Sequence, residues 1–216
     1  MSIKQNLLKI KSNLPENIAL VAVSKTKPVT DLMEAYNAGQ RIFGENKIQE
    51  MTEKWEQMPK DIQWQMIGHV QTNKVKFMAE YVSLIHGVDS LKLVQEINKQ
   101  AQKHNRVIDC LLQIYIADEE TKFGLDQNEL DELLQQVQHE KLNNIKIVGL
   151  MGMATFTENK EQIKKEFLNL KSIFDKFKIH NSDFSILSMG MSGDYQLAID
   201  CGSTMIRIGS SIFGGR

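Results

Sequence analysis

Short apolar runs alternate along this chain with segments in which apolar residues recur every three or four positions. The runs are rich in Val, Ile and Leu, which is typical of strands buried on both faces of a parallel sheet. Eight such runs predict strands at residues 18–25, 41–45, 63–68, 82–88, 107–116, 145–153, 185–191 and 204–209.

The segments between these runs carry helical periodicity. The apolar positions from Leu130 to Val137 are spaced i, i+3, i+4, i+7, as on one face of a helix. Asp126 and Glu129 precede that face with the spacing of an N-cap and its capping-box partner. A second apolar stripe runs through residues 163–177. Ser90 is a candidate N-cap for another helix, which begins directly after this serine. Seven helices between the strands are predicted in this way.

The regular alternation of strands and helices predicts the fold class. Strands separated by helices pair in parallel through right-handed crossovers. An amphipathic segment at residues 2–12 supplies an eighth outer helix at the N-terminus. Eight units in 216 residues predict an α/β protein with a single-domain (β/α)8 TIM barrel spanning residues 1–216. A doubly wound open sheet is the alternative, although it usually contains fewer strands.

Composition narrows the classes of partner and compartment. The net charge is -1, so no general attraction to nucleic acid or to anionic membranes is expected. No stretch of 18 or more apolar residues occurs, which argues against membrane insertion. Cys110 and Cys201 lie in apolar runs and are expected to be buried, reduced thiols. A cytoplasmic protein is therefore predicted.

The ends of the predicted strands carry the candidate chemistry, because barrel enzymes place their sites at the C-terminal ends of the strands. The first strand ends in Ser24-Lys25-Thr26-Lys27, so a buried strand delivers a lysine. The strand has either simply reached solvent there, or its amine is held for chemistry. Small residues follow the last two strands, at 192–193 and 209–211. They suit a phosphate, although Gly and Ser are also common in ordinary turns.

A lysine that faces a phosphate site across a barrel mouth suggests a pyridoxal-phosphate aldimine. The amine reacts only as the free base, so desolvation or a nearby cation must lower its pKa. Lys27 either supplies that cation or is a solvated surface lysine. Arg207 lies inside the last predicted strand, where a guanidinium needs a partner. That partner is either the pyridine nitrogen of the cofactor or a carboxylate in a structural salt bridge.

Six linked motifs carry a resemblance to a known family. They are AVSKTKP, FGEN, IGHVQTNK, GLMGMA, LSMGMSGD and GSTMIRIGSSIFG, in this order from residue 18 to the end of the chain. Together they resemble the pyridoxal-phosphate homeostasis family (the YggS/PROSC group), which is similar to the barrel domain of bacterial alanine racemases. The resemblance implies an alanine-racemase-like barrel that binds pyridoxal 5'-phosphate.

The resemblance also implies roles for individual residues. Lys25, the first lysine of SKTKP, is the expected aldimine residue, and Arg207 is expected to face the pyridine nitrogen. The residues expected at the phosphate are Ser192, Gly209 and Ser210. Asn46 of the GEN motif is expected to line the cofactor pocket. The family often has WHFIG where this chain has WQMIG at residues 64–68, so any acid or base role of that histidine is absent here.

The family role implied is storage, buffering or delivery of the cofactor in vitamin B6 homeostasis, with apo pyridoxal-phosphate enzymes as recipients and a monomer or weak homodimer as the assembly. A low-activity amino-acid racemase is the alternative. Alanine racemases take a second base, a tyrosine, from a C-terminal β-domain, and this chain is expected to lack that domain because it ends directly after the last predicted strand. Tyr195 is the one tyrosine expected near the mouth.

Other chemistries find less support in the sequence. GMSG is not the G-x-S-x-G elbow of a serine hydrolase. The five histidines, at positions 69, 86, 104, 139 and 180, lack metal-ligand spacing, so no metal site is expected. His69 and His86 end predicted strands and could meet near the mouth, although structural hydrogen bonding is the expected role. The sequence also lacks the stripe of basic residues that is typical of nucleic-acid-binding proteins.

Overall fold

Eight parallel strands pair in chain order and close into a barrel in the computed structural model, which describes residues 2–118, 123–179 and 181–215. The first strand closes the ring by pairing in parallel with the last, with Val21 opposite Arg207. This closure confirms the predicted (β/α)8 barrel and excludes the open sheet. The strands are β1 (Ala19–Val23), β2 (Ile42–Glu45), β3 (Gln63–Met66), β4 (Leu84–Val88), β5 (Ile108–Gln113), β6 (Ile145–Met151), β7 (Ile186–Ser188) and β8 (Met205–Ile208).

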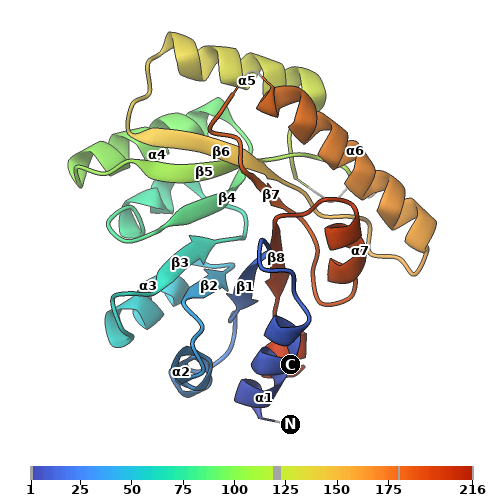
Figure 1. Ribbon diagram of the computed structural model, residues 1–216. Helices are drawn as coiled ribbons and strands as arrows, with labels where there is room; N and C mark the ends of the chain where they lie inside the picture. Colours follow the sequence, from blue (N-terminus) through green and yellow to red (C-terminus); the bar gives the residue numbers. More distant parts are fainter. Residues whose placement is uncertain (1, 119–122, 180, 216) are drawn as a thin grey trace.

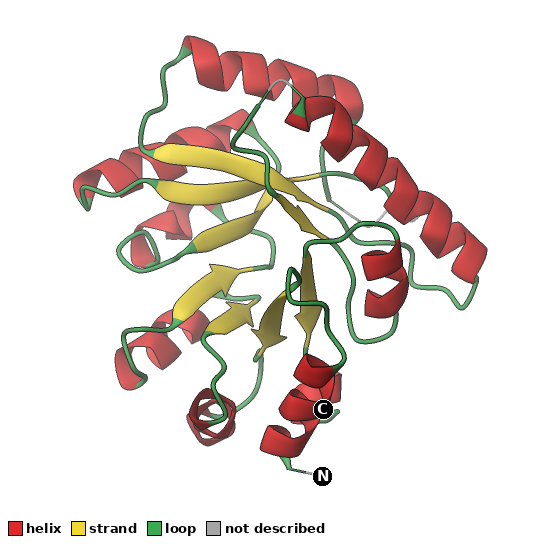
Figure 2. Ribbon diagram, viewed as in Figure 1, coloured by secondary structure: helices red, strands yellow, loops and turns green. Residues whose placement is uncertain are grey.

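Helices surround the strands on the outside of the barrel (Figure 2). They are α1 (Ile3–Ser12), α2 (Val29–Asn37), α3 (Ile48–Gln57), the 3-10 helix η1 (Thr72–Phe77), α4 (Leu91–Lys103), α5 (Gln127–His139), α6 (Lys160–Lys178), α7 (Tyr195–Asp200) and α8 (Ser210–Phe213). The N-terminal helix α1 lies beside α8, so the two ends of the chain meet at one side of the barrel (Figure 1). Asn6 Nδ2 donates a hydrogen bond to the carbonyl of Ile212 at 3.1 Å and joins them.

The local signals in the sequence are mostly confirmed. Asp126 caps α5, and both hydrogen bonds of the capping box with Glu129 are present. Ser90 occupies the N-cap of α4, but its side chain forms no capping hydrogen bond. The connection between β3 and β4 carries only the short 3-10 helix η1.

Alternating strand residues face two separate apolar layers. In β1, Leu20 and Ala22 pack toward the helices, whereas Val21 belongs to a smaller cluster inside the barrel with Leu111 and Met205. All of these side chains are buried. Polar side chains also point inward from β3, β4, β7 and β8, and they form a buried layer with Arg207 at its centre. The barrel therefore has an apolar interior at one depth and a hydrogen-bonded interior at another.

Two further expectations can be compared with the structure. Cys110 and Cys201 are both free and buried, as predicted, and burial raises the pKa of the Cys110 thiol. Such thiols are poor nucleophiles, because the thiolate is the reactive form. Within the described residues, no helix combines the length and apolarity that crossing a membrane requires.

Candidate functional site

A cavity of about 440 Å³ opens at the C-terminal ends of β1, β2 and β8. Its lining includes all six residues that the sequence predicted for one site: Lys25, Asn46, Ser192, Arg207, Gly209 and Ser210. They come from segments up to 185 positions apart in the chain, and the closed barrel brings them together. The remaining lining includes the apolar side chains of Val23, Ile67 and Met153. The cavity thus combines an amine, a guanidinium, hydroxyls and an apolar wall.

Lys25 reaches the cavity because β1 ends two residues before it. Ser24 is fully buried and Lys25 is half-buried, so the chain emerges from the barrel at this lysine. The amide of Lys27 donates to the carbonyl of Ser24 at 3.1 Å, which makes residues 24–27 a tight turn. The turn places Lys25 at the mouth. The buried strand delivers its lysine to a cavity and not simply to bulk solvent.

Two other candidates near the mouth have structural contacts. Lys27 also lines the cavity, but its Nζ donates a hydrogen bond to the carbonyl of Gly215 at 2.9 Å. This bond ties the turn after β1 to the C-terminal residues. Tyr195 begins α7 and packs, partly buried, against the main core, and it is not among the residues that line the cavity.

Small residues bring the ends of β1, β7 and β8 close together. A Cβ added at Gly209 would lie 3.1 Å from the carbonyl oxygen of Val23, so glycine allows this approach. The amide of Gly209 donates to Ser192 Oγ at 3.3 Å, which links the two loops. Helix α8 starts at Ser210, and N–H groups in the first turn of a helix have no intrahelical acceptor. This side of the cavity is therefore suited to hold an anionic group.

Arg207 is held by hydrogen bonds to Ser188 in β7 and to Gly152, which follows β6. Arg207 is only 4% exposed, and its guanidinium donates from Nη1 to Ser188 Oγ at 2.6 Å and from Nη2 to the carbonyl of Gly152 at 3.2 Å. Burial lowers the pKa of Arg207 to about 10, while the charge of Asp194 acts in the opposite direction. Among the described residues it forms no ion pair, so the salt-bridge alternative is not supported. A guanidinium carries further N–H donors for a ligand.

A chain of buried hydrogen bonds continues behind Arg207. Ser188 Oγ lies 3.0 Å from Nδ1 of His86, and Nε2 of His86 lies 2.7 Å from Oε1 of Gln65. The serine accepts from the arginine, so its own proton is free to bond Nδ1, and Nε2–H then donates to Gln65. Burial and the charge of Arg207 together hold the pKa of His86 well below its usual value. His86 is therefore a neutral ring in a chain of donors that runs from β8 to β3.

The sequence analysis did not identify Ser188 and Gln65 as part of the site. The signal that could have found them is a polar residue at an inward position of an otherwise apolar strand, which is costly unless a partner is present. The two histidines considered together do not meet. His86 lies inside β4 and is fully buried, as its predicted structural role requires. His69 stacks on Phe123 with ring centroids 4.7 Å apart.

Asn46 and Gly68 explain how the end of β2 reaches the cavity. Asn46 follows β2 and is half-buried. A Cβ added at Gly68 would lie 2.5 Å from the carbonyl oxygen of Asn46 and 2.9 Å from its Cα. Only glycine permits this contact without displacement of the backbone. The GEN and IGH motifs are thus in direct contact at the mouth.

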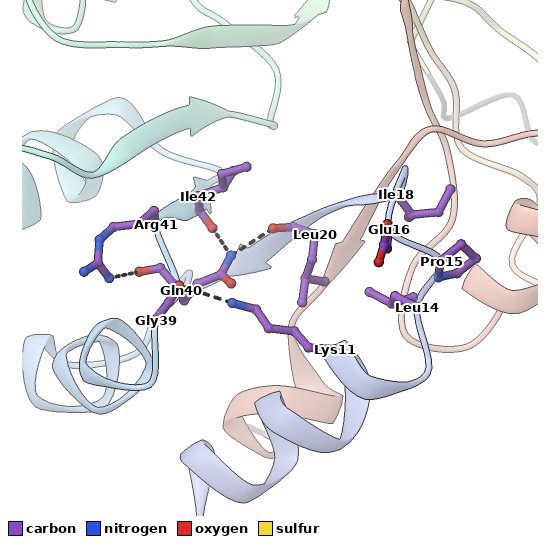
Figure 3. Close-up of a pocket in the computed structure, with 10 residues that line it drawn as sticks. All are labelled: Lys11, Leu14, Pro15, Glu16, Ile18, Leu20, Gly39, Gln40, Arg41 and Ile42. Carbon is purple, nitrogen blue, oxygen red and sulfur yellow. Dashed lines mark hydrogen bonds between the residues drawn. The ribbon is translucent and has the colours of Figure 1, made fainter.

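A second cavity and the positions of the possible metal ligands help to define the site. A cavity of about 390 Å³ lies at the opposite end of β1 and β2, beside Lys11, Gln40 and Arg41, and holds none of the predicted site residues (Figure 3). Within residues 2–118, 123–179 and 181–215, no three His, Cys, Asp or Glu side chains are placed to hold a metal ion. His180, one of the five histidines considered, lies outside the described residues.

Comparisons with known proteins place this geometry in a family. A family model described as "Alanine racemase, N-terminal domain" matches residues 1–216. A relative from Pasteurella multocida named "Pyridoxal phosphate homeostasis protein" is 38% identical over 231 residues, which cover 100% of this chain and 98% of the relative.

Solved structures extend the comparison to three dimensions. PipY of Synechococcus elongatus, solved with PLP bound, is 32% identical with a TM-score of 0.90, and the match covers 99% of this chain and 100% of PipY. An alanine racemase of Clostridium difficile is similar in fold alone, at 20% identity and a TM-score of 0.82. That match covers 100% of this chain but 57% of the racemase.

Proposed function

The chain belongs to the alanine racemase N-terminal domain family, and we propose that it binds pyridoxal 5'-phosphate and serves cofactor homeostasis in the cytoplasm. One observation carries the proposal: Lys25, Arg207 and the Gly209-Ser210 turn line the same cavity. Names of relatives support the same role, since the Pasteurella multocida relative is called a pyridoxal phosphate homeostasis protein and PipY was solved with PLP.

The residues of the cavity match the three polar groups of this cofactor, which are its aldehyde, its phosphate and its ring nitrogen. Lys25 is the amine that the turn after β1 presents, and as a free base it would hold the cofactor through its aldehyde group with loss of water. Ser192 and Ser210 offer hydroxyl donors for the phosphate, together with the backbone at Gly209. Asn46 lines the wall of the cavity between β2 and β3. The 440 Å³ cavity lies within the usual size range of small-molecule sites.

Arg207 favours holding the cofactor over transforming a substrate. A guanidinium with a pKa of about 10 stays protonated at neutral pH and donates hydrogen bonds only. A ring nitrogen that accepts such a bond is disfavoured from taking a proton itself. The ring then withdraws electrons less strongly, which weakens its ability to stabilise a carbanion. Storage, buffering and delivery to apo pyridoxal-phosphate enzymes need only reversible capture, and a monomer or weak homodimer suffices for them.

The test of this proposal is the visible absorption band of lysine-bound cofactor. We expect Lys25→Ala to abolish the band while the far-ultraviolet circular dichroism stays that of the folded protein. Lys27→Ala is the matched control, because Lys27 lies two residues further along in the same cavity and already bonds Gly215. It should retain the band. A band that persists in Lys25→Ala and disappears in Lys27→Ala would reassign the lysine.

A low-activity amino-acid racemase is the second candidate, and the family relationship to alanine racemases is the observation that favours it. Racemisation needs a base on each face of the substrate α-carbon. Incubation of the loaded protein with amino acids in deuterated water measures α-proton exchange directly. Exchange that Lys25→Ala abolishes would indicate a catalyst, and inversion of configuration would make it a racemase. No exchange above that of free pyridoxal phosphate would support the carrier.

A further inference from the structure

The residues on either side of Lys25 are tied to one cluster of charged side chains, Glu45, Glu50 and Lys54. On the N-terminal side, Ser24 Oγ donates to Glu45 Oε1 at 2.6 Å, and the Ser24 carbonyl accepts from Lys54 Nζ at 2.8 Å. On the C-terminal side, the amide of Thr26 donates to Glu50 Oε1 at 2.5 Å. The cluster thus holds the chain immediately before and after the lysine.

Lys54 joins the two halves of the cluster. Its ammonium donates to Glu45 Oε1 and to Glu50 Oε1, each at 2.7 Å, in addition to the Ser24 carbonyl. These three acceptors use all the donors of an ammonium group. Helix α3 contributes both Glu50 and Lys54, one turn apart, while Glu45 ends β2. The cluster therefore connects the ends of β1 and β2 to the helix that follows them.

Burial of the charged side chains of this cluster has a free-energy cost. Glu45 is fully buried and Lys54 is 5% exposed. Burial raises the pKa of Glu45, and the charge of Lys54 only counteracts this. Of the described residues, none bonds the second carboxylate oxygen of Glu45. Buried ion pairs are often no more stabilising than apolar residues of the same volume, so such a cluster calls for a role other than stability.

The backbone that the cluster holds is itself strained. Thr26 has a φ of +64°, in the left-handed region that a β-branched residue rarely adopts. It is the third residue of the turn closed by the amide of Lys27 on the carbonyl of Ser24. Glycine or asparagine is usual at such a position. The bond from its amide to Glu50 holds Thr26 in this uncommon conformation.

We propose that Glu45, Glu50 and Lys54 are positioning residues that lock the turn around Lys25, and thereby set how fast the protein captures and releases its cofactor. The inference rests on the proposed function, since it assumes that Lys25 is the residue that binds. None of the three side chains lines the cavity of Lys25. Their effect on the cofactor therefore passes through the residues beside Lys25, by way of the Ser24 hydroxyl and carbonyl and the Thr26 amide.

The same two strands offer a matched control at their other end (Figure 3). Gln40 is 2% exposed, and its Nε2 donates to the carbonyl of Leu20 in β1 at 2.8 Å and to that of Ile42 in β2 at 2.7 Å. Gln40 is thus a second buried polar clamp between β1 and β2. Gln40 lies at the end of the barrel that does not carry Lys25. Gln40→Leu therefore removes the hydrogen bonds between β1 and β2 there and leaves the turn at residues 24–27 intact.

The experiment measures three things on full-length variants. They are the melting temperature of the apo protein, the rate at which the visible band forms on mixing with pyridoxal phosphate, and the rate at which a carbonyl-trapping reagent removes the band. The variants are Glu50→Ala, Lys54→Met, Gln40→Leu and Lys25→Ala. Glu50→Ala removes the acceptor of the Thr26 amide and is the milder variant, because the Glu50 side chain is 23% exposed and its loss leaves Glu45 paired with Lys54.

We expect Glu50→Ala and Lys54→Met to change the capture or release rate by about tenfold, because misplacing a reacting group by about 1 Å can cost about a hundredfold. Gln40→Leu should keep the wild-type rates even where its melting temperature falls. Wild-type rates in both cluster variants would overturn the inference. The inference would also be overturned if the capture and release rates changed in parallel with the melting temperature in all variants, Gln40→Leu included. A band that survives Lys25→Ala would instead contradict the proposed function.

Discussion

Ser188 and Arg207 are hydrogen-bonded inside the barrel, with Oγ and Nη1 2.6 Å apart. The same hydroxyl lies 3.0 Å from Nδ1 of His86, so one serine connects the guanidinium at the cavity to a buried imidazole. All three side chains are less than 5% exposed. The arginine that faces the cavity is therefore oriented by residues that the cavity does not contain.

Replacement of the serine tests this connection. Ser188→Ala leaves Arg207 Nη1 and His86 Nδ1 without their shared partner, and an unmet buried polar group costs about 1–3 kcal/mol. We expect the free energy of unfolding to fall by that amount in chemical denaturation. We also expect the affinity for pyridoxal phosphate to fall, because the guanidinium loses its orientation.

Ser203→Ala provides the control for that variant. Ser203 is equally buried, and its hydroxyl lies within bonding distance of the carbonyls of Leu187, Met189 and Met205. It should lower stability and leave cofactor affinity unchanged. Equal loss of affinity in both serine variants would argue that Ser188 acts on the barrel as a whole.

His86 predicts a specific dependence of stability on pH. Its folded-state pKa lies well below the value of about 6.5 that a histidine has in an unfolded chain. As the pH falls below about 6.5, the unfolded chain takes up a proton that the folded protein does not. The free energy of unfolding should then decrease with a contribution of up to about 1.4 kcal/mol per pH unit.

Denaturation curves measured from pH 7.5 downward check this contribution. His86→Gln should flatten the slope of unfolding free energy against pH, whatever its effect on stability at neutral pH. His104→Gln, at an exposed histidine, is the control for the substitution itself. If His86→Gln and the wild type have the same slope, His86 is not the buried neutral ring described above.

Arg207 predicts a change in the cofactor itself. Arg207→Ala removes the donor proposed for the ring nitrogen, so we expect weaker binding and a shift of the visible band of bound pyridoxal phosphate. Absorption spectra and equilibrium titration measure both quantities. An unchanged spectrum together with unchanged affinity would place Arg207 away from the cofactor, and its role would then be confined to the bonds with Ser188 and Gly152.

Gly68 offers a test of the wall formed by Asn46. A Cβ there would lie within 3.0 Å of the Asn46 backbone, so Gly68→Ala must displace the residue that follows β2. Overpacking of this kind typically costs about 1–3 kcal/mol, and we expect a lower melting temperature with weaker cofactor binding. Asn46→Ala should weaken binding with a smaller effect on melting. Normal affinity in both variants would remove Asn46 from the site.

Much of the fold was predictable because it is encoded locally. The apolar runs predicted all eight strands, and the 3.6-residue periodicity with its capping box predicted α5. The apolar character of β1 and its abrupt end predicted that Lys25 would emerge at a strand terminus. These signals depend on neighbours within a few positions, so they do not require knowledge of the whole chain. The placement of Lys25, Arg207 and Gly209 in one cavity followed once closure of the barrel was assumed.

The contacts between side chains inside the barrel depend on how the strands are arranged in three dimensions. His86 and Ser188 are 102 positions apart, and their contact depends on the register and tilt of strands that no local pattern specifies. The same holds for Ser24 and Glu45, which are 21 positions apart and meet because β1 and β2 end side by side. Local signals in the chain specify the helices and strands and the polar residues at their ends. Closure of the ring determined the partners, because a buried polar group is satisfied only by the side chains that the packed strands place within hydrogen-bonding distance.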